Sequence, residues 1–203
     1  NCVIPDVHIT CKDGEFIITI NDEVIPVLGV NPFFDAMLKK KDEDEARRFA
    51  QSKLRDARNF INSIRMRNET LIKVVRALVE YQKEFFLHGP KRIVPLTLKD
   101  IAAEIGHHEA TVSRLTSGKY AQTDWGLFEL KYFFSGTVAG TAGQQFSRES
   151  VKHILKEVLA EHQGQTLSDQ KITELLAEKG VKIARRTVAK YRGELDIASS
   201  YDR

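Results

Sequence analysis

Residues 184–192 read Ala184-Arg185-Arg186-Thr187-Val188-Ala189-Lys190-Tyr191-Arg192. The pattern of this short stretch predicts both a helix and the distribution of charge around it. At about 100° per residue, a helix here has one apolar stripe, formed by Ala184, Val188, Tyr191 and Leu195. The opposite side carries only basic or small residues, which are Arg185, Arg186, Ala189, Lys190 and Arg192. Like charges on one arc repel one another, and Arg and Lys bind phosphates and guanine edges. The stretch therefore predicts a helix that faces DNA.

The surrounding sequence predicts that this helix belongs to a small helical unit over 148–203. Apolar residues recur at helical spacing over 151–159 and again over 172–176. Ser147 and Ser168 stand where these two helices need N-terminal caps. We therefore expect three helices that share one core.

Residues 119–147 lie before this unit and divide into two parts. Residues 119–135 are dense in aromatic side chains, and we expect a short helix that completes the core of the preceding unit. Residues 136–147 contain Gly136, Gly140 and Gly143 among small and polar neighbours. This composition predicts a flexible linker and a domain boundary.

Residues 97–118 have the pattern of a helix-turn-helix. Residues 97–100 begin it with a capping-box-like pair, Thr and Asp. Ala102 is small, as two crossing helices require, and Gly106 can adopt the positive φ of a sharp turn. Val112 then anchors the second helix in the shared core. This spacing is typical of DNA-binding helix-turn-helix motifs, although an αα-hairpin that touches no DNA has the same pattern.

The second helix of this motif is expected from about His108 to Thr116. If Val112 and Leu115 point inward, the outward or flanking residues are Glu109, Thr111, Ser113, Arg114 and Ser117. Ser, Thr and Arg side chains bind phosphates and base edges.

The most regular stretch of the chain runs from Ala50 to Phe85. Its seam positions follow in alternating steps of four and three, and most of them are apolar. This periodicity predicts a helix from Glu45 to Leu87, roughly 65 Å long at ~1.5 Å per residue. The alternative is two ordinary helices hinged at Asn68.

Residues 6–30 have the pattern of β-strands. Two β-branched runs surround Lys12-Asp13-Gly14, which is a hairpin-turn signal. Two strands alone are marginal in water, so the hairpin is expected to pack on another part of the chain. The predicted fold is therefore mainly α, with a long helix, a helix-turn-helix unit, a C-terminal three-helix unit and a small N-terminal hairpin.

Composition excludes several classes of protein. No apolar run approaches the roughly 18 residues that span a bilayer, and no signal peptide is recognisable. Two cysteines, Cys2 and Cys11, are too few for a disulfide-stabilised scaffold of 203 residues, and free thiols suit a reducing cytosol. The first residue is Asn1, which suggests a fragment of a longer protein.

The net charge of +3 hides a polarity along the chain. Residues 1–38 hold one basic and six acidic side chains, whereas residues 39–150 hold 20 basic and 14 acidic ones. Such asymmetry is consistent with a nucleic-acid partner.

Residues 184–192 resemble the RpoN box, the signature of bacterial sigma-54 transcription initiation factors. Segments 67–71, 108–114 and 128–134 agree with the same family in order, and 4–7 also fits. The resemblance covers essentially the whole chain. It implies a division into five parts: 1–44, the tail of a core-binding domain; 45–89, an extra-long helix; 90–135, an internal helix-turn-helix unit; 136–147, a linker; and 148–203, the RpoN-box domain.

The resemblance also implies which residues bind DNA. In the family, the RpoN-box helix reads the GG of the −24 promoter element, and the internal helix-turn-helix sits at the −12 element, where DNA first melts. The matching residues of the RpoN box are Arg185, Arg186, Thr187, Lys190, Tyr191 and Arg192, with Arg192 nearer phosphate. The matching residues of the internal motif are His108, Glu109, Thr111, Ser113 and Arg114.

The partners that the resemblance implies are double-stranded promoter DNA, core RNA polymerase and, for the full-length protein, an AAA+ activator ATPase. The long helix would help to hold the polymerase closed until that activator acts. The region that contacts the activator is expected to be absent from this chain. The implied setting is the bacterial cytoplasm, at the nucleoid and without a membrane.

Two other classes of protein remain to be compared with this sequence. An enzyme or metal protein is disfavoured, because His107-His108-Glu109 has the wrong spacing for zinc and no phosphate loop or nucleophile elbow occurs. We therefore expect no catalytic residues, no cofactor and no metal. A dimeric helix-turn-helix repressor, with the heptad seam as its dimer interface, remains the alternative.

Overall fold

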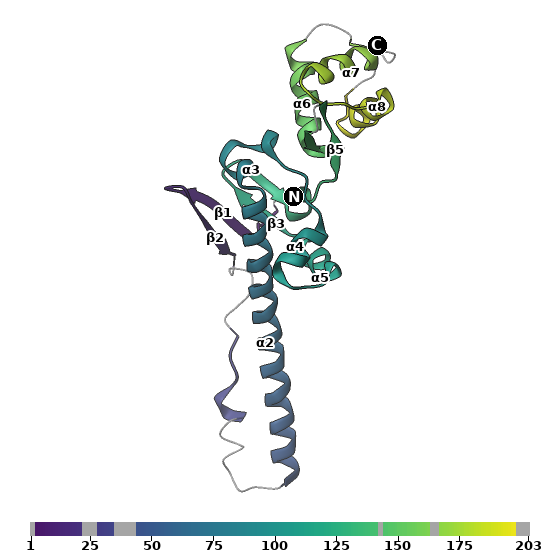
Figure 1. Cartoon of the computed structure of the whole chain (residues 1–203). Coiled ribbons are helices and arrows are strands. Elements are labelled where there is room, and N and C mark those ends of the chain that lie inside the picture. The colour runs from purple at the N-terminus through teal and green to yellow at the C-terminus, as the bar shows by residue number, and fades with distance from the viewer. Residues whose placement is uncertain (1–2, 22–27, 35–43, 142–143, 163–166, 198–203) are drawn as a thin grey trace.

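The computed structural model describes residues 3–21, 28–34, 44–141, 144–162 and 167–197. The described chain is mostly helical and is built around one long helix, α2 (Asp44–Tyr81) (Figure 1). This confirms the predicted mainly helical class. Cys2, Gly143 and the end of the predicted C-terminal unit, 198–203, lie outside the described residues. Among the described helices, none combines the length and apolar character needed to cross a membrane.

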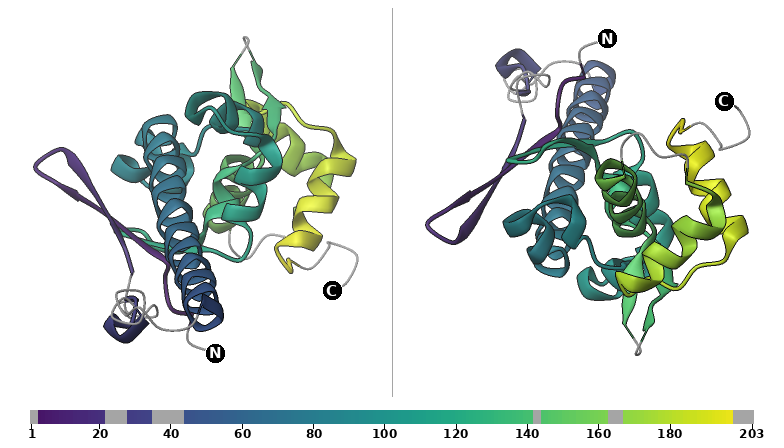
Figure 2. Two further views of the ribbon diagram at one scale, coloured as in Figure 1. Left: turned by 90° about the horizontal axis from the view of Figure 1, so that it is seen from below. Right: turned by 90° about the horizontal axis from the view of Figure 1, so that it is seen from above.

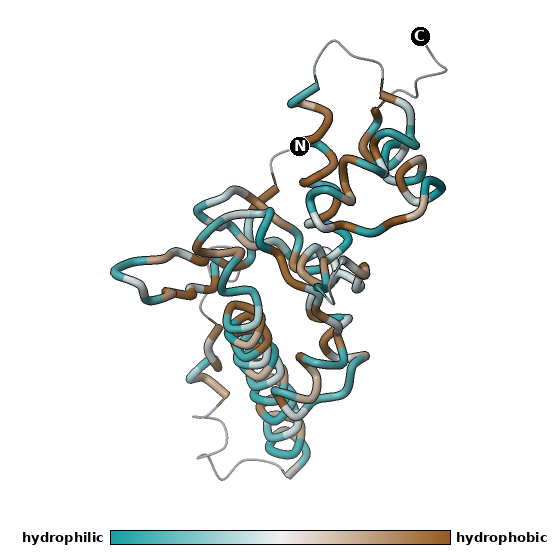
Figure 3. The backbone as a smooth tube through the Cα atoms, turned by 45° about the horizontal axis from the view of Figure 1, so that its top comes forward, coloured by the Kyte–Doolittle hydropathy of each residue, from teal (hydrophilic) through white to brown (hydrophobic). Residues whose placement is uncertain are grey.

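Helix α2 has 38 residues and passes through Asn68 without interruption, in agreement with the single-helix prediction. Its hydropathy alternates along its length (Figure 3). In its C-terminal half, Leu71, Val75 and Leu78 are buried in one core, and Val74 and Ala77 are buried in another. The predicted seam is therefore an intramolecular packing surface in this half of the helix.

The long helix ends at Tyr81, six residues before the predicted end, and a short helix α3 (Lys83–His88) follows. The break is at Gln82, which is fully buried. Its side-chain amide donates to the carbonyl oxygens of Val94 (2.9 Å) and Phe133 (3.2 Å) and accepts from Val94 N (2.9 Å). A buried amide must satisfy its hydrogen bonds, so Gln82 joins three separate segments there. A short 3-10 helix, η1 (Pro90–Arg92), follows α3.

A four-stranded sheet in the order β2-β1-β3-β4 packs on this end of α2. Its strands are β1 (Val7–Lys12), β2 (Glu15–Ile20), β3 (Tyr120–Thr123) and β4 (Gly126–Glu129). The predicted N-terminal hairpin is correct, and it does pack on the long helix. The hairpin is part of the larger sheet, because β1 pairs antiparallel with β2 on one side and in parallel with β3 on the other.

The short helix predicted over 119–135 is wrong. This segment forms the β3–β4 hairpin and then a 3-10 helix, η2 (Leu130–Phe133). Asp6 supports β3, because its carboxylate accepts from Lys119 Nζ (2.6 Å) and Tyr120 N (2.9 Å). The aromatic residues do fill the core: the Phe85 and Phe133 rings meet edge to face with centroids 4.9 Å apart.

The C-terminal unit has its own core. It contains α6 (Arg148–Glu161), α7 (Asp169–Glu178) and α8 (Arg185–Glu194). The buried residues that these helices and the α7–α8 loop contribute are Val151, Leu155, Val158, Ile172, Leu176, Val181, Val188 and Tyr191. Ser147 and Ser168 cap α6 and α7 as predicted.

The segment predicted to be a flexible linker carries two strands, β5 (Thr137–Ala139) and β6 (Gln145–Ser147), paired antiparallel. Val138 and Phe146 pack against the C-terminal core. A Cβ at Gly140 would lie 2.6 Å from the Phe146 ring. The glycine therefore allows close packing, and glycine content alone was a misleading sign of flexibility.

The two sides of α2 differ (Figure 2). The β1–β2 hairpin projects on one side, and the helical units that follow α3 lie on the other.

Candidate nucleic-acid interface

Helix α8 presents a basic surface to solvent. Arg185, Arg186 and Lys190 are exposed, as the sequence predicts, and Ala189 is exposed between them. The first turn of α8 contains no acidic residue, and no side chain caps the helix. Arg185 and Arg186 therefore place two positive charges where the helix dipole is also positive. This arrangement is unfavourable in the isolated protein and favours an anionic partner.

Two of the predicted DNA-binding residues of this helix are buried instead. Tyr191 is 5% exposed and belongs to the C-terminal core. Arg192 is 6% exposed, and its Nη1 donates to Asp169 Oδ1 at 2.8 Å and to the Leu167 carbonyl oxygen at 3.4 Å. Position 192 follows the apolar stripe by one residue, so its guanidinium turns towards the start of α7. Arg192 thus joins α7 to α8 and is not available to phosphate. Thr187 is half-buried.

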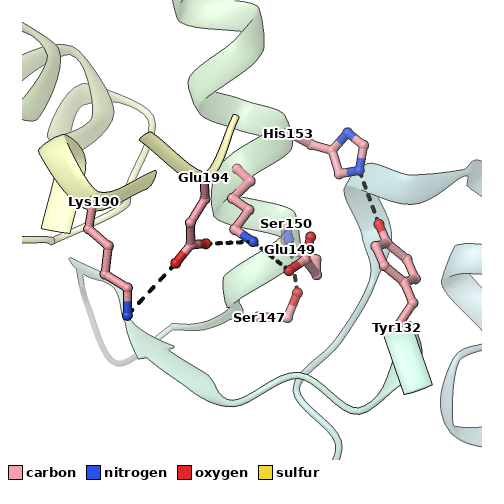
Figure 4. A network of polar contacts seen from close by, with 8 residues as sticks. Tyr132, Ser147, Glu149, Ser150, His153, Lys190 and Glu194 are labelled. Atoms are coloured by element: carbon pink, nitrogen blue, oxygen red, sulfur yellow. Dashed lines mark hydrogen bonds and ion pairs between the residues drawn. The ribbon is translucent and has the colours of Figure 1, made fainter. Parts of the chain in front are cut away.

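Glu194 links Lys190 to α6 through a charge network (Figure 4). Its carboxylate lies 3.8 Å from Lys190 Nζ and 2.9 Å from Lys152 Nζ, and Lys152 also contacts Glu149 at 2.9 Å. Burial opposes the charge on Lys152, but its hydrogen bonds to Glu194 and Glu149 outweigh this effect and raise its pKa. The hydrogen bond from Lys152 lowers the pKa of Glu194. Lys152 and Glu194 are therefore both charged at neutral pH.

The internal helix-turn-helix consists of α4 (Leu98–Ile105) and α5 (Glu109–Thr116). Thr97 and Asp100 form a capping box at its start. Hydrogen bonds with Thr97 lower the pKa of Asp100. Gly106 has φ 67° and ends α4 in the left-handed region, as the sequence predicts. Val112 is fully buried in the core that α4 and α5 share with α2.

The predicted surface residues of α5 differ in exposure. Glu109 and Arg114 are exposed, whereas Thr111 and Ser113 are half-buried. His108 caps α5, because its Nδ1 accepts from Ala110 N at 3.1 Å. One nitrogen of the His108 ring is thus committed to the helix start, which the sequence prediction missed.

Lys182 is exposed in the loop before α8 and was absent from the predicted site residues. The signal was present, since Lys182 belongs to the acid-free basic run from Val181 to Arg192. Across the described ranges, no cluster of three His, Cys, Asp or Glu side chains has a metal-binding arrangement.

These features define the chain as a protein with two helix-turn-helix units, one of which presents a helix with an exposed basic face. A family model described as "Sigma-54, DNA binding domain" matches residues 47–203. The chain therefore belongs to the sigma-54 family, which favours a sigma factor over the repressor that the sequence left open.

Known relatives agree with this assignment. The chain is 44% identical over 202 residues to the RNA polymerase sigma-54 factor of Pseudomonas putida, covering 99% of this chain and 41% of the relative. It is 41% identical over 201 residues to that of Acinetobacter guillouiae, covering 98% of this chain and 42% of the relative. The chain thus spans about two fifths of these relatives.

A solved structure is also similar. The crystal structure of Aquifex aeolicus sigmaN bound to promoter DNA matches with a TM-score of 0.58 and 30% sequence identity. The match covers 98% of this chain and 59% of the Aquifex chain.

Proposed function

We propose that this chain binds sigma-54-type promoter DNA through two surfaces. The exposed face of α8 reads the GG of the −24 element, with Arg185, Arg186 and Lys190 as the base-reading candidates. Helix α5 lies at the −12 element, with Arg114 as its principal cation. The observation that carries the proposal is the exposed, acid-free basic face in the first two turns of α8.

The chemistry of that face supports DNA over other polyanions. Arginine forms bidentate hydrogen bonds to O6 and N7 of guanine in the major groove, which admits an α-helix. The two arginines of the first turn, Arg185 and Arg186, equal the two guanines of the GG step in number. The Aquifex relative is similar in fold, and its structure is of a complex with promoter DNA.

For the full-length protein, we propose the activity of a sigma-54 factor. It directs core RNA polymerase to the promoter and holds the closed complex until an AAA+ activator ATPase acts. The described part of 1–44 contributes strands to the sheet that packs on α2, which fits a role as the end of a polymerase-binding domain. We propose a bacterial cytoplasmic setting at the nucleoid.

Gel-shift titration tests the DNA proposal directly. One duplex carries GG and GC elements one helical turn apart, and the other has both elements scrambled. We expect tighter binding to the first duplex and a steep fall in affinity with added salt, because phosphate contacts release counterions. Arg186→Ala should weaken binding to the first duplex, and Lys12→Ala is its control for the loss of one positive charge, since Lys12 is exposed on the β1–β2 hairpin, across α2 from α8 (Figure 2). Equal affinity for both duplexes would contradict the proposal.

A further inference from the structure

One face of α6 attaches the C-terminal unit to the rest of the molecule. Ser150 is 4% exposed, and its Oγ donates to the carbonyl oxygen of Lys91 in η1 at 2.8 Å. The Tyr132 hydroxyl, from η2, lies 3.1 Å from Nε2 of His153 (Figure 4). The ammonium of Lys91 also forms an ion pair with Glu157.

These α6 residues are spaced as one side of a helix. Ser150, His153 and Glu157 stand at i, i+3 and i+7, so they share a face. The opposite side holds the buried residues of the C-terminal core, such as Leu155 and Val158. Helix α6 therefore has two separate packing surfaces, one within its own unit and one against the central unit.

The protonation states suit this contact. Burial, followed by the charge of Lys156, lowers the pKa of His153, so its ring is neutral at neutral pH. Burial raises the pKa of Tyr132 to about 12, so its hydroxyl stays protonated while it shares a hydrogen bond with Nε2 of His153. Tyr132 and His153 thus form an ordinary donor and acceptor pair across the two units.

The chain connection between the units is very short. Ser135 belongs to the central unit, because its carbonyl oxygen accepts from Leu96 N at 3.2 Å. Thr137 belongs to the C-terminal unit, because it pairs with Ser147 in the β5–β6 hairpin. Gly136 lies between them, and its carbonyl oxygen accepts from Arg148 N at the start of α6 (3.2 Å). The C-terminal unit is held at two places, and it cannot turn about Gly136 without breaking the contact of α6 with η1 and η2.

We propose that this contact sets the spacing and rotational phase of the two DNA sites that the molecule can bind at once. The inference rests on the proposed function, since α5 and α8 must both contact the duplex. Half-sites read from one face of B-DNA lie about one turn apart, roughly 34–36 Å. A fixed contact makes this separation a property of the protein, and the face formed by Ser150, His153 and Glu157 becomes a specificity determinant that never touches a base.

The experiment compares two duplexes for each protein variant. In one, the GG and GC elements are one turn apart; in the other, GC is moved by about five base pairs, to the opposite face. The measured quantity is the ratio of the two affinities. Any effect of a substitution on charge or on α8 itself cancels in this ratio, and a third duplex with GG alone reports binding by the C-terminal unit.

Two changes separate the contact from the chain connection. A four-residue Gly-Ser insertion between Ser135 and Gly136 lengthens the connection and leaves the hydrogen bond from Arg148 N to the Gly136 carbonyl oxygen in place. Ser150→Glu disrupts the contact only, because it sets a larger, anionic side chain against the Lys91 carbonyl. Glu also suits the third position of α6 beside the Ser147 cap, so the helix itself is preserved. Circular dichroism and GG-alone binding confirm that each variant is folded.

For the parent chain we expect the half-turn shift to weaken binding at least about tenfold, since only one of two linked sites then engages. The insertion alone should keep most of this ratio. The insertion combined with Ser150→Glu should reduce it to about threefold or less. The inference is overturned if the insertion alone abolishes the ratio, if the combined variant retains the full ratio, or if the parent chain is indifferent to spacing. Failure to prefer GG alone over a scrambled duplex would instead refute the proposed function.

Discussion

The two helix-turn-helix units, α4–α5 and α7–α8, each consist of two short helices. They differ in what they pack against and in the charge of their second helix. Helices α4 and α5 pack on α2 and depend on it for their core, through Val74 and Ala77. Helices α7 and α8 pack on α6 and on the β5–β6 hairpin, in a core that contains no residue of α2. The first unit is thus a lateral extension of the long helix, and the second is a unit with its own interior.

The second helices of the two units, α5 and α8, also differ in charge. Helix α5 begins with a side-chain cap from His108 and carries one exposed acid, Glu109, and one exposed base, Arg114. Helix α8 has no side-chain cap and begins with two arginines. We therefore predict that α8 gives most of the affinity for DNA and that α5 contributes less to the binding free energy.

The largest expected effect is on the stability of the α7–α8 unit, and it tests whether Arg192 stabilises the fold or contacts DNA. Arg192→Ala removes one partner of a mostly buried ion pair and leaves Asp169 uncompensated, which should cost about 3 kcal/mol of unfolding free energy. Native-state hydrogen exchange without DNA should show the loss in α7 and α8 and not in α4 and α5. Arg185→Ala, which changes an exposed arginine of the same helix, is the control. Unchanged protection with weakened DNA binding would restore Arg192 to the phosphate-contacting role predicted from sequence.

The second prediction tests which unit is the anchor. Arg186→Ala should cost about 1–3 kcal/mol of DNA-binding free energy and relax the preference at the GG step. Arg114→Ala should cost less, because Glu109 already offsets part of the charge of α5. Gel-shift titration of both variants on one duplex measures the difference. The opposite order would make α5 the main anchor and invert the comparison.

The third prediction compares the caps of the two units. Thr97→Ala should cost about 1 kcal/mol in the local stability of α4, because Thr97 is part of a complete capping box. Ser168→Ala should cost less in α7, where Ser168 accepts one bond from Lys171 N at 3.2 Å. Hydrogen exchange of the amides in each helix measures both. Equal losses would show that the carboxylate of Asp100 adds nothing to the cap.

The capping box also has a pH dependence. Hydrogen bonds with Thr97 lower the pKa of Asp100 in the folded protein. A carboxyl with a lowered folded pKa stabilises the fold above its unfolded pKa, and this contribution is lost as pH falls through the folded value. The difference between the parent chain and Thr97→Ala should therefore shrink in acid. A difference that does not change with pH would contradict the role of Asp100.

The smallest expected effect concerns Glu194. Its carboxylate lies near Lys190 and competes with DNA for that side chain. Glu194→Gln should therefore tighten DNA binding by about 0.5 kcal/mol, in the range of exposed ion pairs. Glu174→Gln, at an exposed position on α7, is the control for a lost acidic charge. Equal gains in both variants would mean that net charge alone is responsible.

The sequence predicted the features that depend on local periodicity. The uninterrupted course of α2 past Asn68, the turn at Gly106 and the caps at Ser147 and Ser168 all follow from spacing within one element. Such signals are local, and a single sequence contains them.

The errors concern contacts between residues far apart in the chain. Strand β3 pairs with β1, more than a hundred residues earlier, as well as with β4 next to it in the chain. Gly140 resembles a linker residue until Phe146 packs against it. Arg192 resembles its basic neighbours until Asp169, 23 residues before it, turns it inward. A stripe of like charges predicts a surface, but it does not say which member has an internal partner.

Gln82 also has a mechanical consequence. Helix α2 is about 57 Å long at ~1.5 Å per residue, and its last turns are wedged between the sheet core and the helix-turn-helix core. Helix α2 ends next to Gln82, and the buried Gln82 amide binds the carbonyl oxygens of Val94 and Phe133 in two other segments. A sideways force applied near Asp44 therefore acts through a long arm about a fixed pivot. The resulting torque falls on the two cores beside that pivot, one of which holds α4 and α5.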